Sequence, residues 1–247
     1  CIDACTHGAR FGIDDVSAFL AALGRKEKIV AIAAPAVAAN YPEDYLRLNS
    51  WLKSIGVSAV FDVSFGAELT IRSYLNYIEE KKPSTVISQP CPAIVTFVET
   101  YVPELIPHLA PADSPMLHTV KMIHEFYPEY RDAKVLVLSP CFAKKREFHS
   151  AGYDGKIFNV TFKSISEYLS NKGVSLSSFQ EMPYDNPPAE RAVLFSTPGG
   201  LLATAERDFP GITEMSRKIE GKEMIYPYLQ RLPEVIKNGH APVIVDC

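Results

Sequence analysis

The chain has 247 residues, of which 47% are hydrophobic and 22% charged, and its net charge is −4 at pH 7. This composition excludes a disordered, collagen-like or coiled-coil protein, and the acidic balance disfavours a bulk nucleic-acid binder. The longest apolar run, residues 29–39, contains Pro35 and is too short to span a bilayer. The chain begins at Cys1 without a signal peptide, so we expect a piece of a longer cytoplasmic protein.

Short apolar runs alternate with longer amphipathic stretches along the whole chain. This alternation predicts an α/β fold with mostly parallel sheets. Strands are expected at residues 29–33, 59–62, 85–88, 134–138, 159–162, 192–195 and 243–245. Helices are expected at residues 41–55, 68–80, 93–101, 114–126, 164–171 and 222–237. The polar, proline-rich stretch 175–190 predicts a surface loop.

Local signals mark several helix ends. Pro42 lies near the start of the first predicted helix and Gly56 just past its end. This fits the general preference for proline at the first helical position and for glycine just after the last one. Ser164 and Glu167 fit a capping box, and Gly173 is placed to end the same helix.

The five cysteines are the strongest chemical feature: Cys1, Cys5, Cys91, Cys141 and Cys247. An odd number in a chain of this size does not predict a disulfide framework, and a buried, inert thiol explains any single one of them. Three of them, however, follow predicted strands closely, and the carboxyl ends of strands are where open α/β sheets bind ligands. Thiols that converge at such an edge favour a soft metal site, either zinc or an iron–sulfur cluster.

Zinc is the first alternative. Structural zinc sites use closely spaced cysteine pairs, whereas the three strand-end cysteines are widely separated. His118, His124 and His149 could add ligands, but none has ligand spacing to a cysteine, and a surface or helical position explains each of them. A cluster held by one cysteine from each of several strand ends fits the spacing better.

Two further features carry weaker signals. Cys1 and Cys5 form a Cys-x3-Cys step, which ends a ferredoxin-type motif but also arises by chance. Lys144 and Lys145 directly follow the Cys141 turn. Such a pair is usually a solvated helix start, yet a lysine at a helix N-terminus opposes the helix dipole, which favours a nearby anionic ligand.

The segments Ser-Gln-Pro-Cys-Pro at residues 88–92 and Ser-Pro-Cys-Phe-Ala-Lys-Lys at residues 139–145 resemble the catalytic domain of [FeFe] hydrogenases. The resemblance extends in the same order to residues 34–37, 61–70, 101–105, 114–115 and 199–200, and so covers nearly the whole chain.

The fold implied by this resemblance has two parallel-sheet lobes with flanking helices and a cofactor cleft between them. We expect the lobes at roughly residues 13–110 and 111–247, and residues 1–12 resemble the tail of a ferredoxin-like [4Fe-4S] module. The first lobe would carry the loops of Pro35, Ser64 and Cys91, and the second those of Cys141, Gly199 and Gly200.

The cofactor of that family is the H-cluster, a [4Fe-4S] cubane joined through a cysteine to a diiron unit with CO, cyanide and dithiolate ligands. The resemblance assigns Cys91 and Cys141 as two of its four cysteines. Cys247 either supplies a third or lies just before the last pair, and the bridging cysteine is absent from the sequence, so we expect a truncated C-terminus. Cys1 and Cys5 would hold a further [4Fe-4S] cluster with the preceding module.

Other residues of the cofactor pocket also carry over from the family. Lys144 matches the lysine that hydrogen-bonds a cyanide ligand, a role that suits a compact cation. Ser139 replaces a methionine beside the diiron unit, and Met116 replaces a glutamine. The pocket-lining set implied by the resemblance is Pro35, Ser64, Pro90, Pro115, Ser139, Thr197, Gly199 and Gly200.

The chain departs from the family at its proton relay. Pro90 stands where fast hydrogenases have the relay cysteine, and Tyr74, Tyr77 and Ala110 stand at the positions of two glutamates and a serine. None of these four residues titrates near neutral pH, as general acid–base transfer requires. This pattern resembles the slow, sensory branch of the family.

Three hypotheses follow. In the first, the chain binds an H-cluster, reacts slowly with dihydrogen or senses it in an anaerobe, and exchanges electrons with a ferredoxin-like module or redox partner, with signalling domains attached. In the second, it is a non-catalytic iron–sulfur protein, similar to nuclear prelamin-recognition and cytosolic iron–sulfur assembly proteins. In the third, it is a metal-free structural module. The first two keep the cluster cysteines, and none involves nucleic acid or a membrane.

Overall fold

The computed structural model describes residues 6, 7, 9 and 11–247. The chain divides into two compact units, and each unit is assembled from two separate stretches. Unit 1 consists of Cys1–Phe61 and Glu129–Asp185, and unit 2 of Asp62–Pro128 and Asn186–Cys247.

This division corrects the expected lobes at residues 13–110 and 111–247. The reason is that the first strand of unit 1 pairs with a strand that begins only at Lys134. Most of the chain between them, Asp62–Pro128, instead forms a second compact unit with Asn186–Cys247. Pro35 and Cys141 consequently belong to unit 1. Ser64, Cys91, Gly199 and Gly200 all belong to unit 2.

Unit 1 is built on a four-stranded sheet in the order β2-β1-β4-β5. Its strands are β1 (Ile29–Ala33), β2 (Val60–Asp62), β4 (Lys134–Ser139) and β5 (Ile157–Thr161). β1 pairs in parallel with β4, and β4 with β5. Every residue of β1 and β5 is buried. Burial on both faces explains why β1 is apolar without alternation, whereas β5 also contains the polar residues Asn159 and Thr161.

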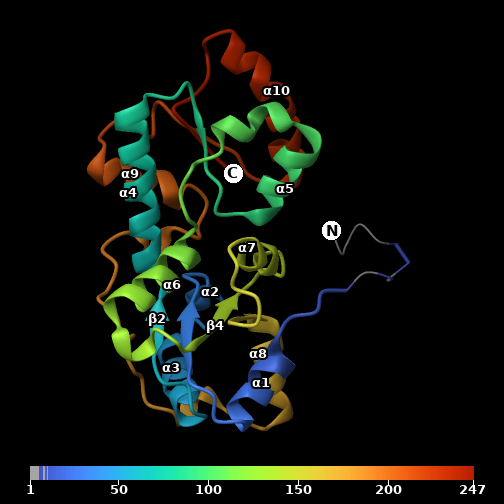
Figure 1. Ribbon diagram of the computed structural model, residues 1–247, viewed down its shortest axis with the longest axis vertical. Coiled ribbons are helices and arrows are strands. Elements are labelled where there is room, and N and C mark those ends of the chain that lie inside the picture. Colours follow the sequence, from blue (N-terminus) through green and yellow to red (C-terminus); the bar gives the residue numbers. More distant parts are fainter. Residues whose placement is uncertain (1–5, 8, 10) are drawn as a thin grey trace. The chain divides into compact units, whose positions relative to one another are not determined.

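Helices flank this sheet (Figure 1): α1 (Val16–Gly24), α2 (Val37–Asn40), α3 (Tyr45–Ser54), α7 (Lys144–Ser150) and α8 (Phe162–Asn171). Aromatic side chains make two of the contacts. The ring of Phe19 on α1 lies 6.2 Å from that of Phe158 on β5, and the rings of Trp51 on α3 and Tyr168 on α8 are 6.2 Å apart, centroid to centroid.

Unit 2 has a shorter parallel sheet in the order β3-β7-β6. The strands are β3 (Val86–Ile87), β6 (Arg217–Lys218) and β7 (Ile244–Asp246). The helices around it are α4 (Val63–Lys81), α5 (Pro92–Tyr101), α6 (Pro115–Phe126), α9 (Gly200–Asp208) and α10 (Lys222–Lys237), of which α5 and α10 pack on the same apolar cluster (Figure 1). Ile244 and Val245 of the central strand are completely buried.

The fold class expected from the sequence is confirmed, with parallel sheets and flanking helices in both units. One predicted strand is wrong, because residues 192–194 form a short 3-10 helix. The Glu68 carboxylate accepts the backbone N–H groups of Glu190, Arg191 and Ala192, at 2.7, 2.8 and 3.3 Å. These N–H groups are therefore held by a side chain and are not available for a strand ladder.

The predicted glycines after helix ends are confirmed, whereas two of the predicted helix starts are wrong. Gly56 and Gly173 both adopt positive φ just after helices, as predicted. The capping box at Ser164 is wrong, since Thr161 is the N-cap and its hydroxyl accepts the Ser164 N–H. The helix expected at 68–80 starts earlier, at Val63, because the Asp62 carboxylate caps it.

Helices α1, α7 and α9 and the short strand β6 were not among the elements expected from the sequence. No helix in the described part of the chain has both the length and the apolar character to cross a bilayer.

We predict that Gly66→Ala destabilises unit 2. A Cβ at Gly66 on α4 would overlap the Pro115 carbonyl oxygen and the Thr119 hydroxyl on α6, so the two helices would have to separate. Overpacking of this kind costs about 1–3 kcal/mol of unfolding free energy. Urea denaturation measures it, with Gly24→Ala as the control because a Cβ at Gly24 has no neighbour within 4 Å. Equal effects of the two substitutions would contradict the close helix contact.

Candidate functional site

Two of the candidate thiols lie together in unit 2. β3 and β7 are neighbouring parallel strands, with Ile87 opposite Val245, so their carboxyl ends meet at the same edge. Cys247 directly follows β7, and Cys91 is the N-cap residue of α5 in the segment after β3. Both are free, partly buried thiols that pack against the same apolar cluster. The Cys247 N–H also donates to the Ser88 hydroxyl at 3.4 Å.

This edge of unit 2 disfavours uncompensated negative charge. Burial, with Asp246 and Cys91 nearby, raises the pKa of the Cys247 thiol to about 12. Burial also raises the pKa of Asp246 to about 6, against the opposing charge of Lys218. Two free thiols that contact one apolar cluster are soft donors of the kind that iron–sulfur clusters use, so the donor set fits such a group.

A cavity of about 240 Å³ adjoins Cys247 in unit 2. The structure brings four of the predicted site residues to its wall: Pro90, Thr197, Gly199 and Cys247. Gly199 adopts φ +76° immediately before α9, a backbone conformation that favours glycine. Gly200 has a packing role, since a Cβ there would overlap the Leu194 carbonyl group.

Ser64 and Pro115 belong to unit 2 but do not line this cavity. Ser64 is buried in the first turn of α4, where its N–H donates to the Asp62 carboxylate at 2.8 Å. Pro115 is the first residue of α6, behind the N-cap Ser114. Both positions are explained locally by helix initiation.

The third candidate thiol, Cys141, follows β4 in unit 1. Its N–H donates to the Ser139 hydroxyl at 3.2 Å, and its carbonyl accepts from the Asn159 amide at 3.0 Å. Pro35 follows the neighbouring strand β1, where the Ala34 N–H donates to the Leu138 carbonyl at 2.9 Å. The structure thus places Pro35, Ser139 and Cys141 at one edge of the same sheet. Their positions after strands follow the prediction, whereas the expected assignment of Pro35 and Cys141 to different lobes is wrong.

The two lysines after Cys141 have different environments. Lys144, the first residue of α7, is only 8% exposed, and its ammonium lies 2.7 Å from the Glu147 carboxylate. The Lys145 side chain is 55% exposed and pairs with Asp15 at 2.6 Å. A buried ammonium is retained only with anionic or hydrogen-bonding partners, so Lys144 is the lysine of the pair that is built into the fold.

Neither unit forms a complete metal site by itself in the described residues, because no three His, Cys, Asp or Glu side chains gather there. The histidines considered for zinc do not join the thiols in this part of the chain. His149 on α7 pairs with Asp154 at 2.7 Å, and His118 and His124 lie on α6. Cys1 and Cys5 fall outside the described residues.

The positions that the sequence resemblance assigns to a replaced proton relay lie near Gln89. The Tyr74 hydroxyl accepts the Gln89 N–H at 3.2 Å, and the Gln89 amide donates to the Ala110 carbonyl at 2.9 Å. Tyr77 packs on the same apolar cluster as Tyr74 and Ala110. Gln89 directly precedes Pro90. Pro90, Tyr74, Tyr77 and Ala110 are therefore neighbours in space although they are separated in the sequence.

Asn159, Gln89 and Lys218 are site residues that sequence reasoning missed. A sequence signal existed for Asn159, because an amide inside an apolar strand run must find partners when buried. Gln89 and Lys218 carried no such sequence signal, since polar residues are common in turns and in exposed strands.

These features define the class: an α/β protein with two parallel sheets whose strand ends carry free thiols. Residues 27–234 match the sequence profile of the family described as "Iron only hydrogenase large subunit, C-terminal domain". The chain belongs to this family.

Three similar proteins illustrate the relationship. Iron hydrogenase 1 of Clostridium pasteurianum is 24% identical over 78% of this chain and 38% of its own length. Cytosolic iron-sulfur assembly component 3 of Rattus norvegicus is 24% identical over 67% of this chain and 41% of its own length. The solved structure of apo [FeFe]-hydrogenase HydA1 from Chlamydomonas reinhardtii, variant C377H, matches with TM-score 0.63 and 23% identity, over 79% of this chain and 58% of that one. The chain therefore spans about two-fifths of the length of these two curated relatives.

We predict that His118 makes the fold sensitive to acid. Burial lowers the pKa of His118 below its usual 6.5, with Lys121 adding to the effect and Asp113 opposing it. The unfolded chain then binds this proton more readily, so stability falls as the pH drops below 6.5. Urea midpoints between pH 7 and pH 5 should fall less for His118→Gln than for the wild type. Parallel pH profiles would show that another group controls the acid response.

Proposed function

We propose that this chain is the hydrogenase-like domain of an iron–sulfur protein that reacts slowly with dihydrogen, or senses it, by H2 ⇌ 2H⁺ + 2e⁻. The observation that carries the proposal is the pair of turns holding Cys91 and Cys141, each after a buried parallel strand, in a chain of the hydrogenase family. The two electrons would pass to a ferredoxin-like module or another redox partner.

The cofactor in this proposal is a [4Fe-4S] cluster with a diiron unit, which supplies the redox chemistry when bound. Cys91, Cys141 and Cys247 would hold it, and Cys1 and Cys5 would serve a further cluster. Three thiols from the described residues are one fewer than the four that a [4Fe-4S] cluster uses. Soft thiolate ligands suit iron–sulfur clusters, and the separated strand ends suit a bulky group better than a single zinc ion.

Lys144 would bind the anionic ligands of the diiron unit. Its ammonium is buried, and Glu147 holds it at 2.7 Å at the start of α7. A cation restrained in this way is oriented before the ligand arrives, so it forms charge-assisted hydrogen bonds at a small entropic cost. A [4Fe-4S] cubane without the diiron unit would offer Lys144 no comparable anionic ligand.

The slow rate follows from the groups around Gln89. A phenol at Tyr74, a methyl group at Ala110 and a pyrrolidine ring at Pro90 stand where fast members of the family move protons. None of them exchanges a proton readily at neutral pH. Proton delivery would therefore limit turnover, while electron exchange with the cluster would not be affected.

The second candidate is a non-catalytic iron–sulfur protein that keeps the fold for electron transfer, cluster assembly or partner binding. The replaced relay positions favour it, as does the similarity to cytosolic iron-sulfur assembly component 3. The two functions differ in the diiron unit, which only the first requires.

Infrared spectroscopy of the full-length protein, matured anaerobically with a diiron source, separates the two. Bands of metal-bound CO and cyanide that shift under hydrogen would support the first function. A cubane signal in electron paramagnetic resonance without such bands would support the second. Protein without iron after the same treatment would overturn both.

We predict that Cys91→Ala and Cys141→Ala each lose cluster iron. Each substitution removes one thiolate and leaves a ligand position open, so iron per chain should fall to near zero after anaerobic reconstitution. Iron is measured by a colorimetric assay and the fold by circular dichroism. Ser73→Ala is the control, since its hydroxyl donates to the Leu69 carbonyl within α4 and, in the described part of the chain, no hydrogen bond joins it to a candidate cysteine. Full iron retention in either cysteine variant would remove that residue from the ligand set.

We predict that Pro90→Cys does not raise hydrogen turnover. The substitution restores one relay member, but the Tyr74 hydroxyl accepts from the Gln89 backbone and Ala110 has no titratable group, so the path stays interrupted. Hydrogen evolution with a reduced dye measures the rate. A large increase would contradict the interrupted relay.

A further inference from the structure

Asn159 is an unusual residue for the centre of a buried strand. It is 1% exposed on β5, where an unpaired amide would be costly. Its Oδ1 lies 3.2 Å from the Ser139 hydroxyl, and its Nδ2 donates to the Cys141 carbonyl at 3.0 Å. Both ends of this side chain are therefore used at the Cys141 turn.

Both backbone polar atoms of Cys141 are held at this turn. The N–H donates to the Ser139 hydroxyl at 3.2 Å, and the carbonyl accepts from Asn159. Ser139 is in turn completely buried at the end of β4. The backbone of Cys141 is thus restrained before and after its Cα atom, which limits the directions that its thiol can take.

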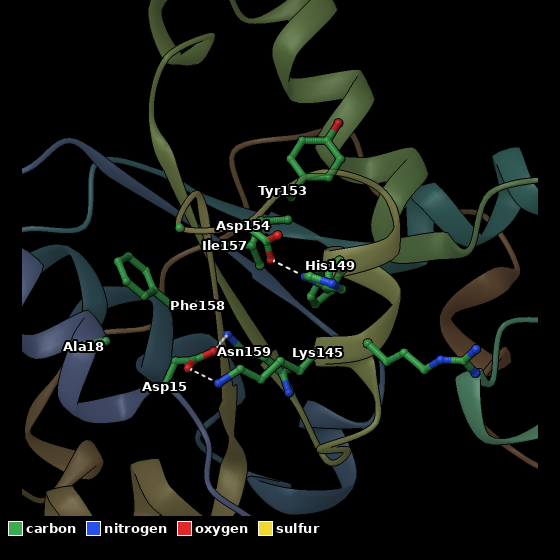
Figure 2. Close-up of a pocket in the computed structure, with 12 residues that line it drawn as sticks. Asp15, Ala18, Lys145, His149, Tyr153, Asp154, Ile157, Phe158 and Asn159 are labelled. Carbon is green, nitrogen blue, oxygen red and sulfur yellow. Dashed lines mark hydrogen bonds and ion pairs between the residues drawn. The ribbon is translucent and has the colours of Figure 1, made fainter. Parts of the chain in front are cut away.

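The side chain of Asn159 bonds to the Cys141 turn, whereas its backbone bonds to the segment before α1. Its N–H donates to the Asp15 carboxylate at 3.0 Å, and its carbonyl accepts the Asp15 N–H at 3.0 Å. Figure 2 shows the Asp15 carboxylate between Asn159 and Lys145, whose ammonium lies 2.6 Å from it. Two residues further along β5, Thr161 donates its N–H and its hydroxyl to the Asp14 carboxylate, each at 2.8 Å.

Residues 14 and 15 therefore cover the outer edge of β5, the last strand of the sheet. An edge strand presents N–H and C=O groups that need partners. Here the carboxylates of Asp15 and Asp14 accept the N–H groups of Asn159 and Thr161, and the Asp15 N–H donates to the Asn159 carbonyl. The result is a continuous set of hydrogen bonds that runs from Asp15 through Asn159 to Ser139 and Cys141.

We propose that Asn159 is a positioning residue for Cys141, and that it transmits to this turn the attachment of the chain segment at Asp15. The inference rests on the proposed function only where Cys141 binds iron. Ser139 and Asn159 bond to each other, and between them they also bond both polar backbone atoms of the candidate ligand. This second set of bonds is what a pair that only stabilises the strands would not need.

The first experiment uses the metal-free, reduced chain and measures alkylation of each cysteine by iodoacetamide with mass spectrometry. Asn159→Ala should speed alkylation of Cys141 about fivefold, the factor equivalent to about 1 kcal/mol for one net hydrogen bond. Cys91, which lies in the other unit, is the internal reference and should not change.

Asn49→Ala is the matched control. Asn49 is also 1% exposed in unit 1, and it donates to a loop carbonyl, that of Met182, at 3.0 Å. Its removal should destabilise the same unit without speeding Cys141 alkylation. If it speeds alkylation as much as Asn159→Ala does, the effect is one of general stability and the inference is overturned.

The proposed link between the segment at Asp15 and the Cys141 turn is tested with substitutions of Asp15, which leave the buried strands unchanged. Asp15→Ala removes the acceptor of the Asn159 N–H, whereas Asp15→Asn keeps an oxygen that can accept it. The first should speed Cys141 alkylation and the second should restore the wild-type rate. An unchanged rate in Asp15→Ala would overturn the transmission from Asp15.

A last measurement concerns the loaded protein. After iron–sulfur reconstitution, Asn159→Ala should shift the cluster midpoint potential, and Asn49→Ala should not. Wild-type protein that binds no iron would overturn the proposed function while the alkylation experiment still decides the role of Asn159. Bound iron, with alkylation and potential both unaffected by Asn159→Ala, would overturn the inference and leave the proposed function standing.

Discussion

Parallel pairing between strands that are far apart in the sequence determines where the candidate ligands of each unit lie. In unit 1, β1 pairs with β4, so the turns of Pro35 and Cys141 leave the sheet at one edge. In unit 2, β3 pairs with β7, which brings the segments of Cys91 and Cys247 together in the same way.

Because the strand ends are buried, the polar groups there need hydrogen-bond partners. At the end of β4 the Ser139 hydroxyl and the Asn159 amide satisfy the Cys141 backbone. At the end of β7 the Ser88 hydroxyl accepts the Cys247 N–H. Among the described residues, the Thr85 hydroxyl is the one buried side-chain polar atom without a partner. The turns that carry the thiols are therefore held by their surroundings before any metal binds, which reduces the entropic cost of binding.

The sequence was sufficient for features that depend on local pattern, and insufficient for those that depend on distant partners. Apolar runs located the long strands, and their ends located the thiols and Pro35. The 3-10 helix at residues 192–194 was missed because the N–H groups at its start, those of residues 190–192, are held by Glu68, more than a hundred residues earlier. The discontinuous units were missed because they follow from the pairing of β1 with β4, which no local window contains. The burial of Lys144 likewise depends on tertiary packing.

The positions where the resemblance to hydrogenases breaks down have acquired a common role. Tyr74, which the sequence resemblance assigns to a relay position, accepts the Gln89 N–H just before Pro90 and Cys91. Ser139, which the same resemblance assigns to the position of a methionine, accepts the Cys141 N–H. In both units, then, a substituted side chain bonds the backbone of a turn that carries a candidate ligand. Groups committed to such bonds are poor proton carriers, since a relay must break and reform its hydrogen bonds. Substitutions of this kind would favour a rigid cluster site over fast turnover, which is the balance that a slow or sensory domain requires.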